Sequence, residues 1–201
     1  NHDTILTYTA GGEQTYKPQY LPPDEHYLNQ YRLVEPDTGR HYQLTSLLNP
    51  AKDRPNLTYE FLGVTRVWRW TKERMQEAYE KGLVVQSGKG RVPRFKRYLD
   101  EQEGVQVDSI WTDIGPLSGQ SMESLGYPTQ KPIALLERIL KLSSNENDVV
   151  LDAFCGCGTA LVAAQHLGRQ WIGIDISPTA CRVMAKRLRD VCRLPEDEDL
   201  W

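Results

Sequence analysis

The C-terminal part of this 201-residue chain is predicted to adopt an α/β fold. Two apolar runs, DVVLDAF (148–154) and QWIGIDI (170–176), have the composition of strands that are buried on both faces of a sheet. A loop with two glycines follows the first run, within LDAFCGCGTA (151–160). Helical patterns precede, separate and follow the two runs, which is the order of a βαβ unit with parallel strands.

Local signals mark the ends of the three helices of this unit. Pro132 lies in the first turn of the first helix. The second helix is predicted over 159–167 and stops at Gly168. Ser177 caps the third helix and Pro178 opens it. Apolar residues at helical spacing line one side of the first and third helices: Leu135, Leu136, Ile139 and Leu140, then Ala180, Val183, Met184, Leu188 and Val191.

The part of the chain before this unit is less regular. DTILTYT (3–9) predicts a strand. Further on, Thr71 can cap a short helix that ends at Gly82. LVVQ (83–86) predicts a strand, and SGKGRVPRFKRY (87–98) predicts a loop or hairpin.

The net charge of -3 hides one strongly basic segment. Residues 64–98 carry ten Lys and Arg against three Asp and Glu, whereas residues 1–63 and 99–201 have net charges of -3 and -7. A local basic patch indicates a polyanion such as nucleic acid, although a solvated charged face explains the charge alone equally well. Trp68 and Trp70 of this segment have apolar neighbours, so we expect them in a core rather than stacked on bases.

The bulk composition excludes several classes of protein. The chain is 39% hydrophobic and 25% charged, as in globular domains, and no apolar run is long enough to cross a membrane. Four cysteines in a chain of this size do not make a disulfide scaffold, so the expected location is the reducing cytoplasm.

The glycine loop predicts a binding site for a nucleoside cofactor. Gly156 and Gly158 follow the first strand, and Asp175 ends the second strand 19 residues after Gly156. Ligands of parallel sheets bind at the carboxyl ends of the strands, where such an acid accepts hydrogen bonds from ribose hydroxyls. The alternative is a tight turn between strand and helix beside an unrelated acid.

The residues of the loop separate the candidate cofactors. Leu161 stands where a dinucleotide fingerprint needs its third glycine, and the carboxylate of Asp152 would repel a pyrophosphate. No Gly-Lys-Ser/Thr follows, which excludes a P-loop. S-adenosylmethionine has both an ammonium group and a ribose, so it fits better than the nicotinamide cofactor of an oxidoreductase.

The four cysteines do not predict a metal site. Cys155 and Cys157 are two residues apart, and neither they nor Cys181 and Cys192 have the spacing of zinc ligands. We expect no metal, and we interpret Cys155 and Cys157 as small residues of a tight loop.

Three motifs carry a resemblance to a known family. GYPTQKP (126–132), LDAFCGCGTA (151–160) and WIGIDIS (171–177) occur in the order seen in amino-methylating DNA methyltransferases of the β permutation class, which modify N6 of adenine or N4 of cytosine. The chain resembles this family over residues 126–193. Upstream, VWRWTKERM and GRVPRFKRYLDE resemble its target-recognition part.

The chain departs from the family pattern in three places. Ala153 and Cys157 replace a proline and a serine of the loop motif. The catalytic D/N/S-P-P-Y/F/W tetrad is not found, since LPPDEH (21–26) has no acid before its prolines and no aromatic residue after them. The opening HDTILTYT (2–9) resembles the strand after the catalytic segment. We therefore expect the C-terminal part of a longer methyltransferase, or half of a split one, inactive alone; a catalytically inactive DNA- and cofactor-binding module is the alternative.

The resemblance implies a partial Rossmann-like methyltransferase sheet with an appended α+β target-recognition lobe. Residues 1–13 would be a remnant of the catalytic subdomain, 14–114 the target-recognition region and 115–201 the cofactor-binding βαβ region. The implied partners are double-stranded DNA, with its target base flipped out of the helix, and the missing catalytic half or a second copy.

The resemblance and the chemistry assign roles around the glycine loop. Asp152 would accept from the methionine ammonium group of the cofactor. Phe154, Gly156 and Gly158 would shape the loop, and the glycines would let backbone amides approach the methionine carboxylate. Thr159 would cap the helix or contact that carboxylate.

Four further residues would complete the cofactor site. Asp175 would hold both ribose hydroxyls. Ile176 would pack on the adenine ring or else belong to the strand core. Thr129 and Lys131 would close the methionine end, unless Lys131 is a solvated surface lysine.

Cations of the basic segment are the expected DNA contacts, mostly with phosphates. They are Arg66, Arg69, Lys72, Lys89, Arg91, Arg94, Lys96 and Arg97.

Overall fold

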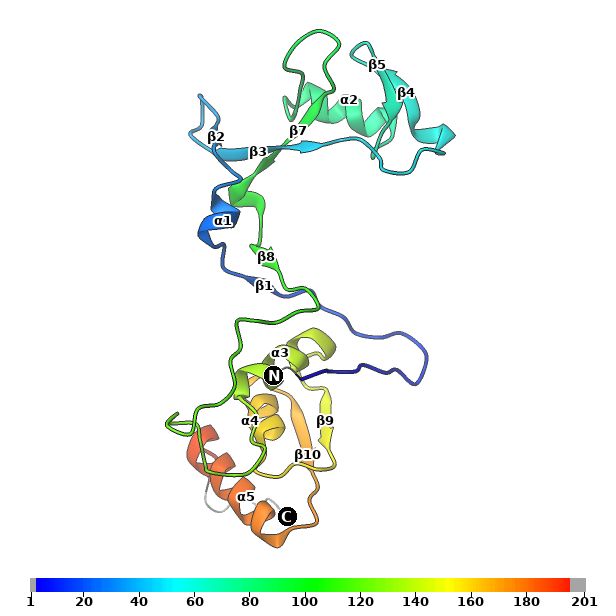
Figure 1. The fold of residues 1–201 in the computed structure, drawn as a ribbon. Helices are drawn as coiled ribbons and strands as arrows, with labels where there is room; N and C mark the ends of the chain where they lie inside the picture. Colours follow the sequence, from blue (N-terminus) through cyan, green and yellow to red (C-terminus); the bar gives the residue numbers. More distant parts are fainter. Residues whose placement is uncertain (1–2, 196–201) are drawn as a thin grey trace. The chain divides into compact units, whose positions relative to one another are not determined.

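The computed structural model describes residues 3–195, which form two compact units (Figure 1). Within the described residues, the terminal unit combines residues 3–19 with 106–195, and the central unit is residues 20–105. None of the helices in the described residues is long and apolar enough to cross a membrane.

The terminal unit contains the predicted βαβ arrangement. Its elements are α3 (Ile133–Ser143), β9 (Val149–Asp152), α4 (Thr159–His166), β10 (Gln170–Gly173) and α5 (Pro178–Cys192). Strands β9 and β10 pair in parallel, with Trp171 opposite Val150. The prediction of parallel strands joined by a helix is therefore confirmed, as are the cap at Ser177 and the start of α5 at Pro178. Pro132 is the N-cap of α3 rather than a residue of its first turn.

Helix α4 covers one face of this two-stranded sheet. Leu161, Val162, Ala163 and Ala164 of α4 are completely buried, and α4 itself lies between α3 and α5 (Figure 1). The packing is close at Gly173 of β10, where a Cβ atom would lie 2.7 Å from Leu161 Cδ1. The glycine in this strand thus lets the helix approach the sheet.

The opposite face of the sheet corrects one prediction. Val149, Leu151, Ile172 and Ile174 are each more than half exposed, so the expectation that both faces are buried is wrong for the described residues. Side chains alternate along a strand, and α4 covers only the alternate set that includes Val150 and Trp171.

The strand predicted over residues 3–9 is also wrong. These residues form no regular element, and Ile5, Leu6 and Tyr8 are exposed. A strand is stable only when its backbone N–H and C=O groups pair with a neighbouring strand, and no described strand lies in register with this segment.

The central unit is built from small antiparallel sheets. A four-stranded sheet has the order β2 (Leu33–Val34), β3 (His41–Ser46), β7 (Arg94–Tyr98) and β6 (Val84–Val85). Strands β4 (Thr58–Phe61) and β5 (Val64–Val67) form a hairpin. The remaining elements are β1 (Tyr20–Leu21), which pairs with β8 (Val105–Gln106), helices α1 (Glu25–Leu28) and α2 (Lys72–Glu80), and 3-10 turns at Pro55–Leu57 and Leu99–Glu101.

Trp68 is the centre of the core of the central unit. Its side chain has no exposed surface, packs with Phe61, Met75 and Val84, and donates a hydrogen bond from Nε1 to the Tyr59 carbonyl at 2.9 Å. The prediction that Trp68 belongs to a core is confirmed. Helix α2 begins after Thr71, whose hydroxyl accepts from the Arg74 amide, so the predicted cap is also confirmed.

Candidate functional site

The glycine loop and Asp175 meet at the carboxyl ends of the two parallel strands. Past the strands, the Ile174 amide donates to the Asp152 carbonyl at 2.9 Å, and the Cys155 amide donates to the Ile174 carbonyl at 3.0 Å. These bonds extend the pairing into the loop. The amide of Gly156 then donates to Oδ2 of Asp175 at 2.8 Å, so the two predicted parts of the site lie together.

Asp175 is held in a fixed orientation and keeps acceptor capacity. Its Oδ2 accepts from Gly156, and its Oδ1 accepts from the Ser177 amide at 2.8 Å. A carboxylate has about four lone-pair positions, so each oxygen retains one for a ligand hydroxyl. Asp152 is similarly oriented, because its Oδ1 accepts from the Phe154 amide at 3.1 Å.

The two glycines supply left-handed backbone rather than free amides. Gly156 and Gly158 have φ angles of +50° and +76°, which side-chain-bearing residues rarely adopt. The Gly156 amide is bonded to Asp175, and the Gly158 amide donates to the Cys155 carbonyl at 2.7 Å. The amides of the two glycines are thus engaged inside the protein, and the approach of other backbone amides of the loop to a carboxylate of the cofactor stays a prediction.

Neighbouring side chains also leave little room for a Cβ atom at either position. A Cβ at Gly158 would lie 2.6 Å from Met184 Cγ, which is in the core of the terminal unit. A Cβ at Gly156 would lie 3.1 Å from Cε1 of Tyr127, so the ring of Tyr127 lies against the loop.

Both cysteines of the glycine loop are buried. Burial, followed by the charges of Asp152 and Asp175, raises the pKa of the Cys155 thiol to about 11. Its Sγ lies 3.4 Å from Sδ of Met184, and Cys157 is also buried. A protonated buried thiol is a poor nucleophile and metal ligand, which supports the interpretation of Cys155 as a small loop residue.

Two apolar side chains stand exposed beside the loop. Phe154 is 91% exposed and Ile176 is 100% exposed, although both are large and hydrophobic. They follow β9 and β10 and so flank Asp152 and Asp175. Such surface is available to an apolar part of a ligand, whereas the alternative of Ile176 as a core strand residue is wrong in this structure.

The other three predicted cofactor residues have different surroundings. Thr129 is exposed and has a φ of +63°. Lys131 Nζ lies 2.8 Å from Asp3 Oδ2, and both side chains are at least half exposed. Thr159 is buried, and its hydroxyl accepts a hydrogen bond from Arg187 at 2.9 Å. Its side chain is therefore already engaged inside the protein.

Sequence reasoning missed Arg187, Glu123 and Tyr127, which contact or support the glycine loop. One signal was present. Arg187 lies on the same side of α5 as Met184 and Leu188, three and one residues away, and a charged residue on an apolar helix face calls for an internal partner. Glu123 and Tyr127 lie in an irregular loop and gave no such signal.

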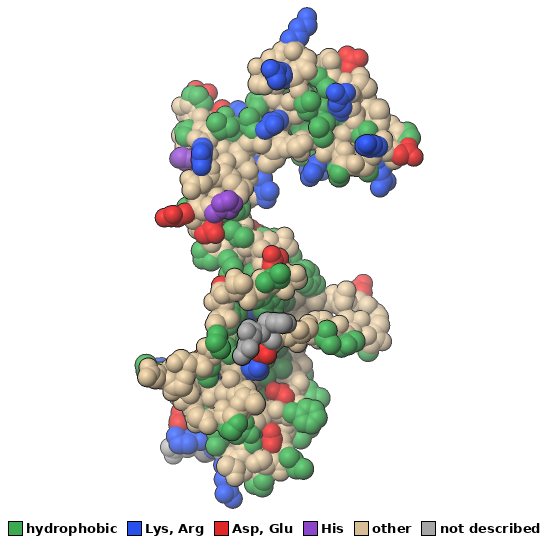
Figure 2. Space-filling model, viewed as in Figure 1, with side chains coloured by type: hydrophobic (Ala, Val, Ile, Leu, Met, Phe, Trp, Pro, Cys, Tyr) green, Lys and Arg blue, Asp and Glu red, His purple; other side chains and the backbone are tan. Residues whose placement is uncertain are grey.

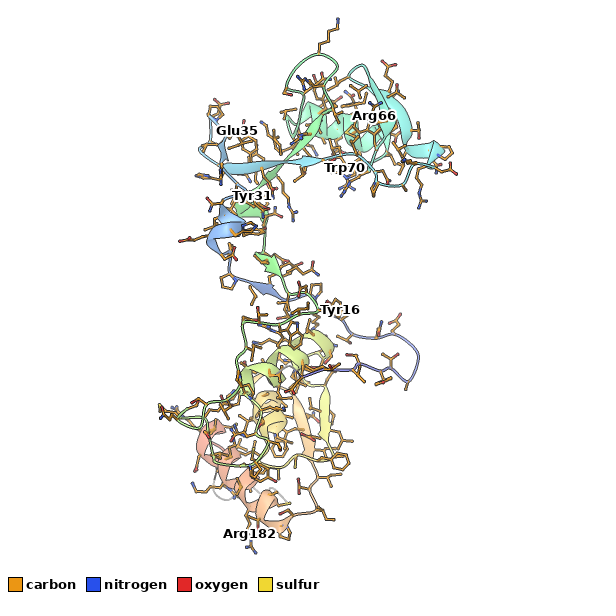
Figure 3. All side chains as sticks on the ribbon, viewed as in Figure 1. Tyr16, Tyr31, Glu35, Arg66, Trp70 and Arg182 are labelled. Atoms are coloured by element: carbon orange, nitrogen blue, oxygen red, sulfur yellow. The ribbon has the colours of Figure 1, made fainter. Side chains whose placement is uncertain are left out.

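The predicted DNA contacts all belong to the central unit, whose visible surface carries many Lys and Arg side chains (Figure 2). Arg66 is on β5, as Figure 3 shows, and Lys72 opens α2. Lys89 and Arg91 lie in the loop between β6 and β7. Arg94, Lys96 and Arg97 are on β7.

Seven of these eight cations have no carboxylate partner among the ion pairs of residues 3–195. Arg69 and Arg97 donate instead to neutral acceptors, the Leu48 carbonyl and the Gln102 side chain. Lys96 is the exception, because its Nζ lies 2.8 Å from Glu35 and its side chain is only 13% exposed. Lys96 would have to leave Glu35 to reach a phosphate.

The Gln86 side chain links the β4–β5 turn to the β6–β7 loop, and both of these hairpins carry predicted DNA contacts. Its Nε2 donates to the Leu62 carbonyl at 3.0 Å and to the Arg91 carbonyl at 2.7 Å. Leu62 lies in the β4–β5 turn, and Arg91 lies in the β6–β7 loop. Arg66 and Arg91 therefore lie on two elements that are joined by hydrogen bonds from the Gln86 side chain.

The Glu35 carboxylate also raises the pKa of the Tyr98 hydroxyl. The Tyr98 hydroxyl donates to Glu35 Oε2 at 2.6 Å, and this hydrogen bond, together with burial, raises the pKa of Tyr98 to about 12. The hydrogen bonds from Lys96 and Tyr98 hold the pKa of Glu35 below its usual range.

Alkaline titration is expected to show a late ionisation of Tyr98. Its pKa in an unfolded chain is about 10, so its stabilising contribution is complete below that pH and is lost as pH rises through about 12. Tyrosinate absorbance should show this step, and Tyr98→Phe should remove it. The comparable step of the half-buried Tyr59 should remain. Tyr16→Phe, at an exposed position, is the control. If Tyr98→Phe instead removes a titration step near the ordinary tyrosine pKa of about 10, the expectation is contradicted.

Comparisons with known proteins agree on one family. A family model described as DNA methylase, N6_N4_Mtase, matches residues 1–187. The type II methyltransferase M.EcaI of Enterobacter cloacae is 30% identical over 190 residues, covering 92% of this chain and 42% of that protein. The type II methyltransferase M2.LlaDCHI of Lactococcus lactis subsp. cremoris is 45% identical over 87 residues, covering 43% of this chain and 32% of that protein.

The chain spans less than half the length of these two relatives. Among solved structures, the M1.HpyAVI–SAM complex is 42% identical over 33% of each chain, with a TM-score of 0.32.

Proposed function

The chain belongs to the N6/N4 DNA methylase family, and on this premise we propose that it provides the S-adenosylmethionine-binding and DNA-contacting parts of a DNA amino-methyltransferase. One observation carries the proposal. The glycine loop after β9 is hydrogen-bonded to the acid after β10, at the carboxyl ends of parallel strands. This is where sheets of this kind bind nucleoside ligands.

The residues present fit this cofactor. Asp175 keeps a free lone pair on each oxygen for the two ribose hydroxyls. Asp152 is a half-buried carboxylate beside the loop and suits the methionine ammonium group. Phe154 and Ile176 offer apolar surface to the adenine. When bound, the cofactor supplies an electrophilic methyl group for the exocyclic amine of a flipped adenine or cytosine.

The cofactor roles of the remaining predicted residues are proposed as follows. Gly156 and Gly158 give the loop its left-handed turns, and Thr159 fixes the start of α4 from inside. Thr129 and Lys131 lie in the segment that would close over the methionine end. For Lys131 this requires exchange of Asp3, its exposed partner, for the ligand.

Double-stranded DNA is the proposed partner of the central unit. The cations Arg66, Arg69, Lys72, Lys89, Arg91, Arg94 and Arg97 have no carboxylate partner in the described residues, so their charge is available to phosphates. Lys96 is proposed as a secondary contact because Glu35 already neutralises it. This charge distribution supports a polyanionic partner. The proposed location of the protein is the cytoplasm, as expected from its cysteine content.

Methyl transfer itself is proposed to need residues from another segment or chain. Acceptors must orient the lone pair of the amine towards the methyl group, which is a positioning effect. The D/N/S-P-P-Y/F/W tetrad that would do this is not found in the sequence, and LPPDEH (21–26) does not match it. The chain alone is therefore expected to bind cofactor and DNA without methylating.

Calorimetric titration with two cofactors tests this proposal. S-adenosylhomocysteine should bind the chain with a measurable heat. NAD should not, because the carboxylate of Asp152 would repel its pyrophosphate and Leu161 replaces the third glycine of a dinucleotide fingerprint. Binding of NAD in preference to S-adenosylhomocysteine would contradict the proposal and favour a nicotinamide enzyme.

A further inference from the structure

Arg187 is a buried cation that the proposed roles do not use. Within residues 3–195 it is the one charged residue that is buried, at 4% exposure. Its neighbours on α5, Met184 and Leu188, are apolar core residues. Burying a guanidinium is costly unless it is paired and hydrogen-bonded, so its contacts show what it holds in place.

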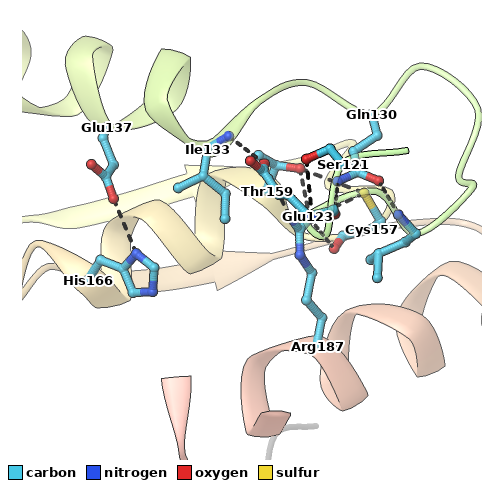
Figure 4. A network of polar contacts seen from close by, with 10 residues as sticks. Ser121, Glu123, Gln130, Ile133, Glu137, Cys157, Thr159, His166 and Arg187 are labelled. Carbon is cyan, nitrogen blue, oxygen red and sulfur yellow. Dashed lines mark hydrogen bonds and ion pairs between the residues drawn. The ribbon is translucent and has the colours of Figure 1, made fainter. Parts of the chain in front are cut away.

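One terminal nitrogen of the Arg187 guanidinium donates hydrogen bonds to the glycine loop. Nη1 donates to the Cys157 carbonyl at 3.2 Å and to the Thr159 hydroxyl at 2.9 Å, as Figure 4 shows. These acceptors lie on either side of Gly158. The guanidinium thus fixes the turn by which the chain passes from β9 into α4.

The other nitrogen faces the irregular loop that precedes α3. Nη2 lies 3.7 Å from Oε1 of Glu123 and makes no hydrogen bond. The same Glu123 oxygen accepts from the Ile133 amide at 2.7 Å, and the Gln130 side chain donates to the Glu123 carbonyl at 2.8 Å (Figure 4). Glu123 is therefore anchored to the segment that carries Thr129 and Lys131.

We propose that Arg187 is a positioning residue of the cofactor site, a buried clamp that sets the 121–131 loop against the glycine loop. This inference rests on the proposed function. The clamp is only partly engaged, because a charge-assisted hydrogen bond from Nη2 to Glu123 needs a distance of about 2.7–2.9 Å. A shift of the 121–131 loop of roughly 1 Å towards the glycine loop completes it. Ligand contacts with both loops favour this closed arrangement.

Tyr127 provides a second link between the 121–131 loop and the glycine loop, at Gly156. The Tyr127 ring already lies beside Gly156, since its Cε1 would be 3.1 Å from a Cβ atom at that position. With Arg187 engaged at Glu123, the two loops are joined both through the buried clamp and through this ring. Loss of the guanidinium leaves the ring contact alone, so the 121–131 loop loses its alignment with the cofactor.

Two measurements on Arg187→Met test the proposal. Hydrogen–deuterium exchange of the free chain should accelerate by about tenfold in both 121–131 and 155–160, since the variant no longer links them. The dissociation constant for S-adenosylhomocysteine, measured well below the melting temperature, should rise by about tenfold. A residue that served the fold alone would lower the melting temperature and accelerate exchange across the terminal unit, without selecting these two loops and without changing the dissociation constant of the folded chain.

Two further variants complete the test. Arg182→Met makes the same substitution at an exposed position of α5 and should change neither quantity (Figure 3). Glu123→Gln keeps the buried arginine, so it should fold and should accelerate exchange in 121–131 while weakening binding. Wild-type exchange in 121–131, or wild-type affinity in both Arg187→Met and Glu123→Gln, would overturn the proposal. If the wild-type chain does not bind S-adenosylhomocysteine, the proposed function fails, and the exchange rates still decide whether the clamp exists.

Discussion

Gly158→Ala is expected to reduce the affinity for S-adenosylhomocysteine by about 100-fold, because a displacement of about 1 Å at a binding loop has an effect of this size. The φ of +76° at this position costs an alanine about 1–2 kcal/mol. The added Cβ would also lie 2.6 Å from Met184 Cγ, in a core that can yield only by shifting α5 or the loop. Calorimetry gives the affinity, and thermal unfolding gives the accompanying loss of stability.

Gly119→Ala is the matched control for this prediction. Gly119 is exposed and lies in the same unit, and a Cβ at this position would meet no atom within 4 Å. Its substitution should leave both the affinity and the melting temperature unchanged. Equal effects of the two substitutions, or no effect of Gly158→Ala, would show that the left-handed turn is not what the site requires.

Removing Arg91 and Arg94 together is expected to weaken binding to duplex DNA by about 50-fold at about 0.1 M salt. Both are exposed, and neither has a carboxylate partner among the described residues. Each lost phosphate contact lowers the slope of log K against log salt by about 0.9, so the double variant should lose about 1.8. Fluorescence anisotropy of a labelled duplex over a salt series measures both quantities.

The control removes the same charge from cations that are already neutralised. Arg40 is paired with Asp100 and Glu101, and Lys81 is paired with Glu77. Arg40→Ala combined with Lys81→Ala should leave the salt slope nearly unchanged. If the two double variants lower the slope equally, the effect comes from net charge, and the DNA-contacting surface lies elsewhere.

Features fixed by neighbouring residues could be predicted from the sequence. Thr71 and Ser177 cap helices through side-chain bonds to amides three residues away, and both caps are found. The approach of Gly156 to Asp175 was predictable too, because carboxyl ends of adjacent parallel strands must meet at one edge.

Features fixed by distant partners could not be predicted. Residues 3–9 have the pattern of a strand but lack a paired strand in the described chain. Lys96 has the appearance of a phosphate contact, yet Glu35, 61 residues away in sequence, occupies it. Arg187 is joined to Glu123 and the glycine loop only by folding. In each case the group that determines the structure lies far away in the sequence, so the neighbouring residues do not reveal it.

Asp175 gives the most direct test of the cofactor site. Asp175→Ala removes the acceptor for both proposed ribose contacts, and hydrogen bonds to a charged group contribute about 1.5–3 kcal/mol each, so the dissociation constant for S-adenosylhomocysteine should rise at least about tenfold. Asp190→Ala, at an exposed acid of α5 paired with Lys186, should leave it unchanged. An unchanged dissociation constant in folded Asp175→Ala would contradict the assignment of this strand end as the cofactor site.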